Sequence, residues 1–258
     1  MTTTLTLHDI PVAFTDRGTG HAVLLLHGGG GPGTVEPWAD RLAASREARV
    51  ITPTHPGFNG TVRPAPLTTV AGLAALYTDL LERLELRDVT VVGNSVGGWI
   101  AAEMAVRAPE RAGRYVVVDG VGVRVPGHPV ADFSSLTLNE VAALSYADPA
   151  AHFTRPDDLP PAARRAMPGN RGALELYAGR AMSDATLLDR LRKITDPALV
   201  VWGEADRICT PGYGHAFAAA IPGATYTVVK GAGHLPQIEQ PGRLADLVWN
   251  FITSRAHA

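Results

Sequence analysis

The sequence predicts an α/β fold, in which a mostly parallel, twisted β-sheet carries helices on both faces and a helical insertion over one end. Short, continuous apolar runs alternate with segments of helical periodicity, which is typical of strands buried on both faces. Between residues 121 and 190 those runs disappear, and short helical signals rich in Pro, Ala and Arg replace them. This change of pattern predicts a cap inserted into an otherwise regular α/β unit.

The first 120 residues hold most of the predicted sheet. Two short strands come first, joined by a turn, and they predict an antiparallel edge. Buried strands and two helices follow, and an apolar stripe on the first of these helices indicates a core-facing side. The predicted strands cover residues 5–7, 12–14, 22–26, 50–53, 89–92 and 114–118, and the predicted helices cover residues 69–84 and 96–108.

The second half of the chain contains the insertion and then a return of the core pattern. Thr137 and Glu140 match a capping box, Asp148 before a proline matches an N-cap, and Ser183 is a candidate cap for a further helix. Buried-strand patterns then reappear, and the last helix is amphipathic. The core strands are expected at residues 198–202 and 225–229, and the helices at 212–220 and around 244–251. We therefore expect a core of residues 1–120 and 191–258 and a helical cap of residues 121–190.

Composition restricts the possible partners. Of the 258 residues, 23 are Lys or Arg and 25 are Asp or Glu, and the net charge of −2 offers no footprint for nucleic acid. No basic and apolar leader is visible, and no apolar run approaches the length needed to span a bilayer. The single cysteine, Cys209, cannot form an intrachain disulfide. We expect a cytoplasmic protein with a small-molecule substrate and no nucleic-acid or membrane partner, and the sequence does not indicate its oligomeric state.

Residues 89–98 contain the sharpest chemical signal. A buried strand ends in Gly-Asn-Ser-Val-Gly at residues 93–97, and a helix begins at Val96. In this context Gly-x-Ser-x-Gly is typical of a nucleophile elbow, which lifts the serine hydroxyl above the sheet. Ser95 is therefore the candidate nucleophile, and the helix N-terminus beside it would stabilise negative charge on a substrate oxygen.

A second glycine-rich segment follows the strand at residues 22–26. His27 is followed by five glycines and one proline in six residues. The segment lacks the Lys-Ser or Lys-Thr of a Walker motif, and Pro32 removes an N–H donor, so nucleotide binding is disfavoured. We expect backbone N–H groups of Gly29 or Gly30, with that of Val96, to form an oxyanion hole, and a plain flexible loop is the alternative.

A serine nucleophile needs a base and an acid that orients it. His234 follows the last predicted strand on a glycine-rich loop, and Asp206 follows the strand before it. Ser95, Asp206 and His234 therefore all lie beyond the ends of parallel strands, where sites form in open α/β sheets. Asp119 also follows a strand and ranks below Asp206 as the acid. Cys209, near Asp206, is expected to be a packed bystander, and no metal-binding pattern is visible.

The order serine, aspartate, histidine and the surrounding motifs resemble the α/β-hydrolase family over nearly the whole chain. The matching segments are the glycine run after His27, residues 93–97, residues 202–206, and Gly233-His234 followed by residues 239–241. The resemblance implies a serine hydrolase that cleaves a carboxylic ester or lactone through an acyl-enzyme, without a cofactor. His27, Trp99 and Leu235 are candidates for the substrate site, although His27 is favoured for ordering its loop.

Three other activities remain open. The glycine loop and Gly-Asn-Ser resemble hydrolases that cleave carbon–carbon bonds of aromatic ring-cleavage products, but those enzymes usually carry a tryptophan after the histidine, where this chain has Leu235. Glycine- and proline-rich loops of this kind also occur in proline iminopeptidases. A non-hydrolytic lyase or a binding protein on the same fold is the third alternative.

Overall fold

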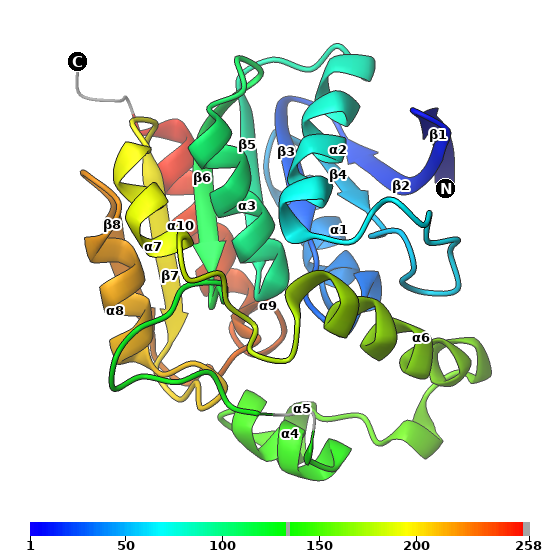
Figure 1. The fold of residues 1–258 in the computed structure, drawn as a ribbon, viewed down its shortest axis with the longest axis vertical. Coiled ribbons are helices and arrows are strands. Elements are labelled where there is room, and N and C mark those ends of the chain that lie inside the picture. Colours follow the sequence, from blue (N-terminus) through cyan, green and yellow to red (C-terminus); the bar gives the residue numbers. More distant parts are fainter. Residues whose placement is uncertain (133–134, 255–258) are drawn as a thin grey trace.

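The computed structural model describes residues 1–132 and 135–254 of the chain. Its centre is one eight-stranded sheet with the order β1-β2-β4-β3-β5-β6-β7-β8 (Figure 1). The strands are β1 (Thr2–Leu7), β2 (Ile10–Gly18), β3 (His21–Leu26), β4 (Ala48–Pro53), β5 (Val89–Asn94), β6 (Ala112–Val118), β7 (Ala198–Gly203) and β8 (Thr225–Val229). All eight predicted strands are present, several with longer bounds than predicted.

Strand direction places the chemistry at one edge. β1 pairs with β2 and β2 with β4 in antiparallel orientation, while every pairing from β4 through β8 is parallel. The carboxyl ends of β3, β5, β6, β7 and β8 therefore point the same way. In register, Leu26 at the end of β3 lies beside Gly93 near the end of β5. The glycine-rich loop after β3 and the turn after β5 consequently start next to each other.

Helices cover both faces of the sheet, as predicted. Alternate residues of each central strand enter two separate apolar clusters: Leu24 packs with α2, α3 and α8, and Val23 packs with α1 and α10. The core helices are α1 (Glu36–Ser45), α2 (Val70–Arg83), α3 (Val96–Arg107), α8 (Pro211–Ala219), α9 (Pro236–Glu239) and α10 (Pro241–Thr253). Neither α1 nor α9 was predicted, because no capping side chain precedes either helix and α9 spans only four residues.

The segment of residues 121–190, called the cap segment below, lies between β6 and β7 and is largely helical. Its helices are α4 (Leu138–Ser145), α5 (Pro149–His152), α6 (Pro161–Ala178) and α7 (Leu187–Arg190), with short 3₁₀ turns at Pro156–Asp158 and, just beyond the segment, at Leu191–Lys193. Helices α4, α5 and α6 lie beyond the carboxyl ends of β6 and β7, at the bottom of Figure 1, whereas α7 lies beside the sheet at the level of the strands.

Two of the three predicted cap signals are confirmed. Thr137 and Glu140 form a reciprocal capping box on α4, and the Asp148 side chain caps α5. The expectation for Ser183 is wrong: it forms an isolated bridge with Gly122, and the next helix begins only at Leu187. Within the described residues, no helix has both the length and the apolar character needed to cross a bilayer.

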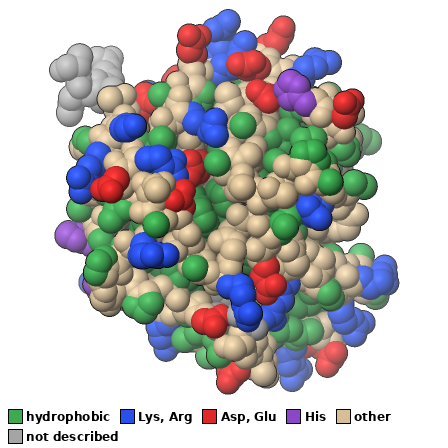
Figure 2. All heavy atoms as spheres, viewed as in Figure 1, with side chains coloured by type: hydrophobic (Ala, Val, Ile, Leu, Met, Phe, Trp, Pro, Cys, Tyr) green, Lys and Arg blue, Asp and Glu red, His purple; other side chains and the backbone are tan. Residues whose placement is uncertain are grey.

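The surface carries both signs of charge. On the face shown in Figure 2, acidic and basic side chains alternate over the core and the cap segment, and apolar side chains are scattered between them. The face therefore presents no extended patch of a single charge.

Candidate active site

Ser95 occupies a sharp turn between β5 and α3. Its backbone has φ 56° and ψ −119°, a conformation that costs a non-glycine residue on the order of 1–3 kcal/mol. The flanking glycines are required sterically. A Cβ atom at Gly93 would lie 2.0 Å from the carbonyl oxygen of Gly97, and one at Gly97 would lie 2.2 Å from that of Leu26. The local sequence thus forces the strained turn that the elbow motif predicts.

Hydrogen bonds tie this turn to the neighbouring strand ends. The Ser95 N–H donates to the Val118 carbonyl at 3.0 Å. The Asn94 side chain donates to the carbonyl of Val118 at 3.2 Å and to that of His234 at 3.0 Å, and it accepts from Gln237 Nε2 at 3.2 Å. Asn94 therefore links the turn after β5 directly to the loop that carries His234.

The glycine-rich loop lies against Ser95. A Cβ atom on Gly28 would be 3.0 Å from the Cβ of Ser95. The Gly28 carbonyl accepts from the His27 ring Nδ1 at 2.7 Å and from the Gly31 N–H at 3.1 Å. Neither the Gly29 nor the Val96 N–H donates to a backbone carbonyl of a described residue. These two N–H groups therefore remain available for a ligand.

Two histidines whose rings are in contact support this loop. His27 and His55 are fully buried, with ring centroids 3.7 Å apart. His27 Nε2 accepts from the His55 N–H at 3.0 Å, so its proton is on Nδ1, and His55 contacts the Tyr77 hydroxyl at 2.5 Å. Burial lowers the pKa of His55 to about 4, and burial together with His55 lowers the pKa of His27 well below its usual value. Both rings are therefore neutral, and both nitrogens of His27 are occupied by backbone groups.

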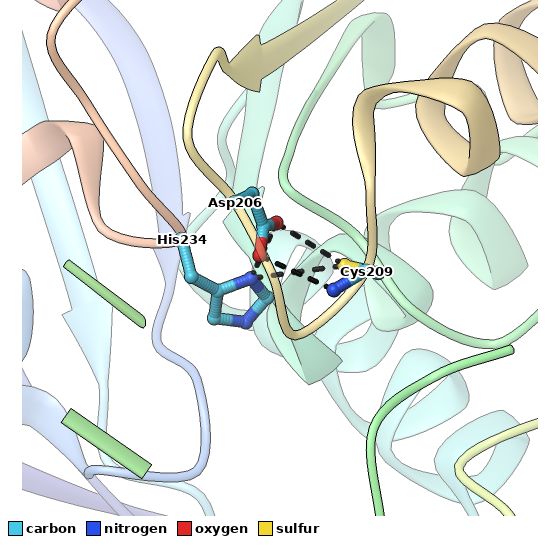
Figure 3. Close-up of side chains that lie close together, drawn as sticks. All are labelled: Asp206, Cys209 and His234. Carbon is cyan, nitrogen blue, oxygen red and sulfur yellow. Dashed lines mark hydrogen bonds and ion pairs between the residues drawn. The ribbon is translucent and has the colours of Figure 1, made fainter. Parts of the chain in front are cut away.

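Asp206 and His234 form a buried hydrogen-bonded pair. His234 Nδ1 lies 2.8 Å from Asp206 Oδ2, and the two residues are only 6% and 2% exposed (Figure 3). Asp206 Oδ1 accepts the backbone N–H groups of Ile208 at 2.8 Å and Cys209 at 3.2 Å. Two backbone N–H donors thus fix the carboxylate so that its other oxygen faces the imidazole. The half-buried Ser95 makes no side-chain hydrogen bond to His234 within the described part of the chain, and such bonds commonly tighten only around a substrate.

Asp119 lies beside this pair but does not contact the histidine. Its Oδ1 accepts the Gly203 N–H at 2.8 Å, and its Oδ2 has no hydrogen-bond partner among the described residues. Burial, and then the charge of Asp206, raise the pKa of Asp119 well above its usual range. Burial therefore favours the protonated form of Asp119, and of the two carboxylates it is Asp206 that contacts the histidine.

Cys209 is fully buried, in keeping with the expectation of a packed residue. Its Sγ also lies 3.3 Å from Asp206 Oδ2 and 3.7 Å from His234 Nδ1, which are contacts that the sequence did not lead us to expect. Its position three residues after Asp206, in the same strand-end loop, was the available signal. Asp206, Cys209 and His234 are side chains of the types that bind metal ions, with ligand atoms within 4.8 Å of one another. Because their hydrogen bonds use those same atoms, we interpret the cluster as a hydrogen-bond network.

The cap segment contacts the site at two places. The His234 N–H donates to the Ser145 carbonyl at 2.6 Å. The buried Glu239 carboxylate accepts the N–H groups of Gly233 at 2.6 Å, Ala147 at 2.9 Å and Asp148 at 3.1 Å, which ties α4 and α5 to the histidine loop.

Helix α6 covers the glycine-rich loop. Asn170 accepts the Asn59 N–H at 2.6 Å and donates to the Gly30 carbonyl at 3.4 Å. The Leu174 side chain lies so close to Gly29 that a Cβ atom there would be 2.6 Å from Leu174 Cδ2. The cap segment therefore rests directly on the loop beside Ser95.

The remaining candidates for the substrate site lie around Ser95 and His234. Trp99 is buried on α3, where its ring lies against Gly122 and its indole N–H donates to Glu103 at 3.3 Å. Leu235 is half-buried and precedes α9 directly after His234. Of these candidates, only Leu235 combines partial exposure with a position next to the proposed base.

The chain belongs to the alpha/beta hydrolase family, whose model matches residues 23–247. Among its relatives is a 2-hydroxymuconate semialdehyde hydrolase from Pseudomonas putida, which is 30% identical over 92% of this chain and 89% of its own length. A thermophilic esterase from Thermogutta terrifontis superposes with a TM-score of 0.79 at 25% identity, covering 98% of both chains. A meta-cleavage product hydrolase, 24% identical, has the same fold with a TM-score of 0.80 over 96% of this chain and 97% of its own.

Proposed function

We propose that this protein is a serine hydrolase that cleaves a small carboxylic ester or lactone through an acyl-enzyme. The observation that carries the proposal is the strained Ser95 turn, joined through Asn94 to a buried Asp206–His234 pair. A hydroxyl on such a turn and an oriented imidazole are the two parts that acyl transfer by serine requires. Membership of the alpha/beta hydrolase family supports the same conclusion.

In the first half of the reaction, His234 Nε2 takes the hydroxyl proton of Ser95 while Ser95 Oγ attacks the substrate carbonyl carbon. The carbon–oxygen bond to the leaving group then breaks, and the imidazolium returns its proton to the leaving alkoxide. Asp206 holds the Nδ1–H tautomer and stabilises the imidazolium. The products of this half are an alcohol and an acyl group on Ser95; in a lactone, both stay on one molecule.

In the second half, His234 removes a proton from water, and the resulting nucleophile attacks the acyl carbon. The bond to Ser95 Oγ breaks, Ser95 recovers its proton, and the carboxylic acid leaves. The alkoxide that forms in both halves needs donors that are already in place.

We assign those donors to the N–H groups of Val96 and Gly29. The Gly28 carbonyl is held on the loop side by two hydrogen bonds, so the N–H of the same peptide, which belongs to Gly29, points the opposite way. The N–H of Gly30 ranks second, because the Gly29 carbonyl of its peptide accepts no hydrogen bond from the described residues that would fix its direction. Losing one such donor costs a hydrolase of this kind about 3 kcal/mol of transition-state stabilisation.

In this proposal residues 121–190 act as the lid over the substrate, and the core of residues 1–120 and 191–258 carries the chemistry. His27 acts by ordering the glycine-rich loop, and Trp99 supports the cap segment where it leaves β6. Leu235 contributes an apolar contact to the substrate beside His234.

The test is hydrolysis of short-chain and long-chain p-nitrophenyl esters and of a lactone, with Ser95→Ala as the paired variant. We expect turnover of at least one ester by the wild-type protein and its loss in the variant. Full turnover by the Ser95→Ala protein would overturn the proposal.

Carbon–carbon bond hydrolysis is the second candidate, because a full-length relative at 30% identity is a 2-hydroxymuconate semialdehyde hydrolase. It would use the same site on a diketone or a ring-cleavage product. Activity on a 2-hydroxy-6-oxo-dienoate without activity on esters would favour it. The reverse pattern would favour the ester hydrolase.

A further inference from the structure

The thiol of Cys209 points into the contact between Asp206 and His234 (Figure 3). Its Sγ lies 3.3 Å from Asp206 Oδ2, the same oxygen that His234 Nδ1 approaches at 2.8 Å. The other acceptors near the sulfur, the carbonyls of Asp119 and Gly120, are farther away at 3.8 and 3.9 Å and carry no formal charge. The nearest and most strongly charged acceptor for the thiol proton is therefore Asp206.

The backbone fixes the thiol in this position. The Cys209 N–H donates to Asp206 Oδ1 at 3.2 Å, and the Cys209 carbonyl accepts the indole N–H of Trp202 at 2.8 Å. Burial, and then the charges of Asp206 and Asp119, raise the pKa of the Cys209 thiol well above its usual value. The sulfur therefore keeps its proton and acts as a donor, and it is a poor nucleophile or site of oxidation.

We propose that Cys209 is a positioning residue for the reaction of Ser95 and His234. Its S–H donates to the Asp206 oxygen that holds the imidazole, keeps that carboxylate in place, and limits how strongly the carboxylate attracts the Nδ1–H. The inference rests on the proposed serine hydrolase function.

The charge environment makes this contact matter. The titratable groups that face the thiol or its carboxylate partner come from the loop after β6, the loop after β7, α8, β8, the loop after β8, and α9. They are Asp119, Asp206, Tyr213, Tyr226, His234 and Glu239. Among these groups, Asp206 is the carboxylate in direct contact with the imidazole. A donor on its Oδ2 weakens the pull of that oxygen on the His234 proton.

The test compares Cys209→Val, which replaces the donor by an apolar side chain one heavy atom larger, with Cys209→Ser, which keeps a donor. We expect the acidic limb of the pH profile of kcat/KM to move to higher pH by about 0.5 unit in the valine variant. The Nδ1–H proton resonance of His234, read by NMR without substrate, should move downfield in that variant. In the serine variant both should stay near the wild-type values. Ile221→Val, a buried change just after the end of α8, is the packing control.

The inference is overturned if the valine variant matches the wild type in both readouts, or if the serine variant departs from it as far as valine does. If the valine protein does not fold, Cys209→Ala takes its place in the same comparison. The NMR readout needs no turnover. If the proposed serine hydrolase function is wrong, the wild-type protein will be inactive on the esters. That outcome is independent of any shift of the His234 resonance.

Discussion

The loops after β3, β5, β7 and β8, called the strand-end loops here, and the cap segment are held in place by different forces. In the strand-end loops, backbone groups approach so closely that no side chain fits, as at Gly93, or bind neighbouring strand ends directly. The cap segment is attached by apolar side chains that join the main core cluster, such as Leu174 and Leu187, and by polar contacts at Glu239, Asn170 and Arg190. The proposed chemistry therefore depends on local backbone geometry, whereas the placement of the cap segment depends on contacts between distant parts of the chain.

The largest effect is expected within the strand-end loops. Asp206→Asn should lower kcat by about 10⁴-fold, because the amide favours the wrong imidazole tautomer and cannot stabilise the imidazolium. Ester hydrolysis under saturating substrate measures it. Glu204→Gln changes an exposed carboxylate two residues earlier, whose nearest partner is the Gly231 N–H at 3.4 Å, and should leave kcat within about twofold. Equal losses in the two variants would contradict the assignment of Asp206.

The next effect concerns the attachment of the cap segment to α3, the helix that follows Ser95. Arg190 binds the buried Glu103 of α3 through two bonds of 2.6 and 2.7 Å and also contacts Asp184 at 2.7 Å. Glu103→Gln should lower the free energy of unfolding by about 3 kcal/mol, because it leaves a partly buried guanidinium without its main partner. Urea denaturation measures the change.

Arg155→Gln removes an exposed ion pair with Asp158 in the same cap segment and is the matched control. It should change stability by less than about 0.5 kcal/mol. If the two variants are equally stable, the cap segment is not anchored through Glu103.

The third effect concerns the support of the glycine-rich loop and depends on pH. Burial lowers the pKa of His55 to about 4, so the unfolded chain binds a proton that the folded one excludes. Stability from His55 is complete above its unfolded pKa of about 6.5 and is lost as the pH falls toward 4, with a loss of about 2 kcal/mol by pH 5. Urea denaturation at pH 7.5 and pH 5 should show this loss. His55→Asn should reduce the acid loss by about 2 kcal/mol and leave the share of the buried His27, and the partly exposed His128→Asn should not change it; an undiminished acid loss in the His55 variant would refute the account.

The smallest effect concerns Glu239, which joins the loop that carries His234 to the cap segment. Glu239→Gln exchanges a carboxylate that accepts three N–H groups for an amide that must turn its NH₂ toward one of them. We expect kcat/KM to fall about 10-fold through displacement of the histidine loop and the adjoining cap residues. Steady-state kinetics on the best ester measure it. Glu175→Gln, an exposed acid on α6, is the control and should leave kcat and KM unchanged.

The same contrast separates what the sequence could predict from what it could not. Buried strands such as β5 consist of apolar runs with abrupt glycine ends, so their order and the loops beyond them were predictable. Ser95, Asp206 and His234 were found because each lies just after such a strand. These features depend on residues close together in the chain.

The cap segment could not be predicted to the same extent. Helix α6 runs for 18 residues with Pro168 inside it, although proline and glycine there argue against a long helix. Tertiary contacts stabilise it, among them Asn170 with Gly30 and the Tyr177 hydroxyl with the Pro56 carbonyl at 2.8 Å. The approach of the Cys209 sulfur to His234, 25 residues away, likewise joins distant parts of the chain. Such pairings carry no local pattern.

The central claim is that Ser95 is a nucleophile activated by the Asp206–His234 pair. Reaction with a fluorophosphonate, followed by mass spectrometry of the digested protein, tests it most directly. The account predicts one phosphonyl group per chain, located on Ser95, with labelling at least about 100-fold slower in Asp206→Asn. Stoichiometric labelling at another residue, or labelling of Ser95 at an unchanged rate in that variant, would contradict it.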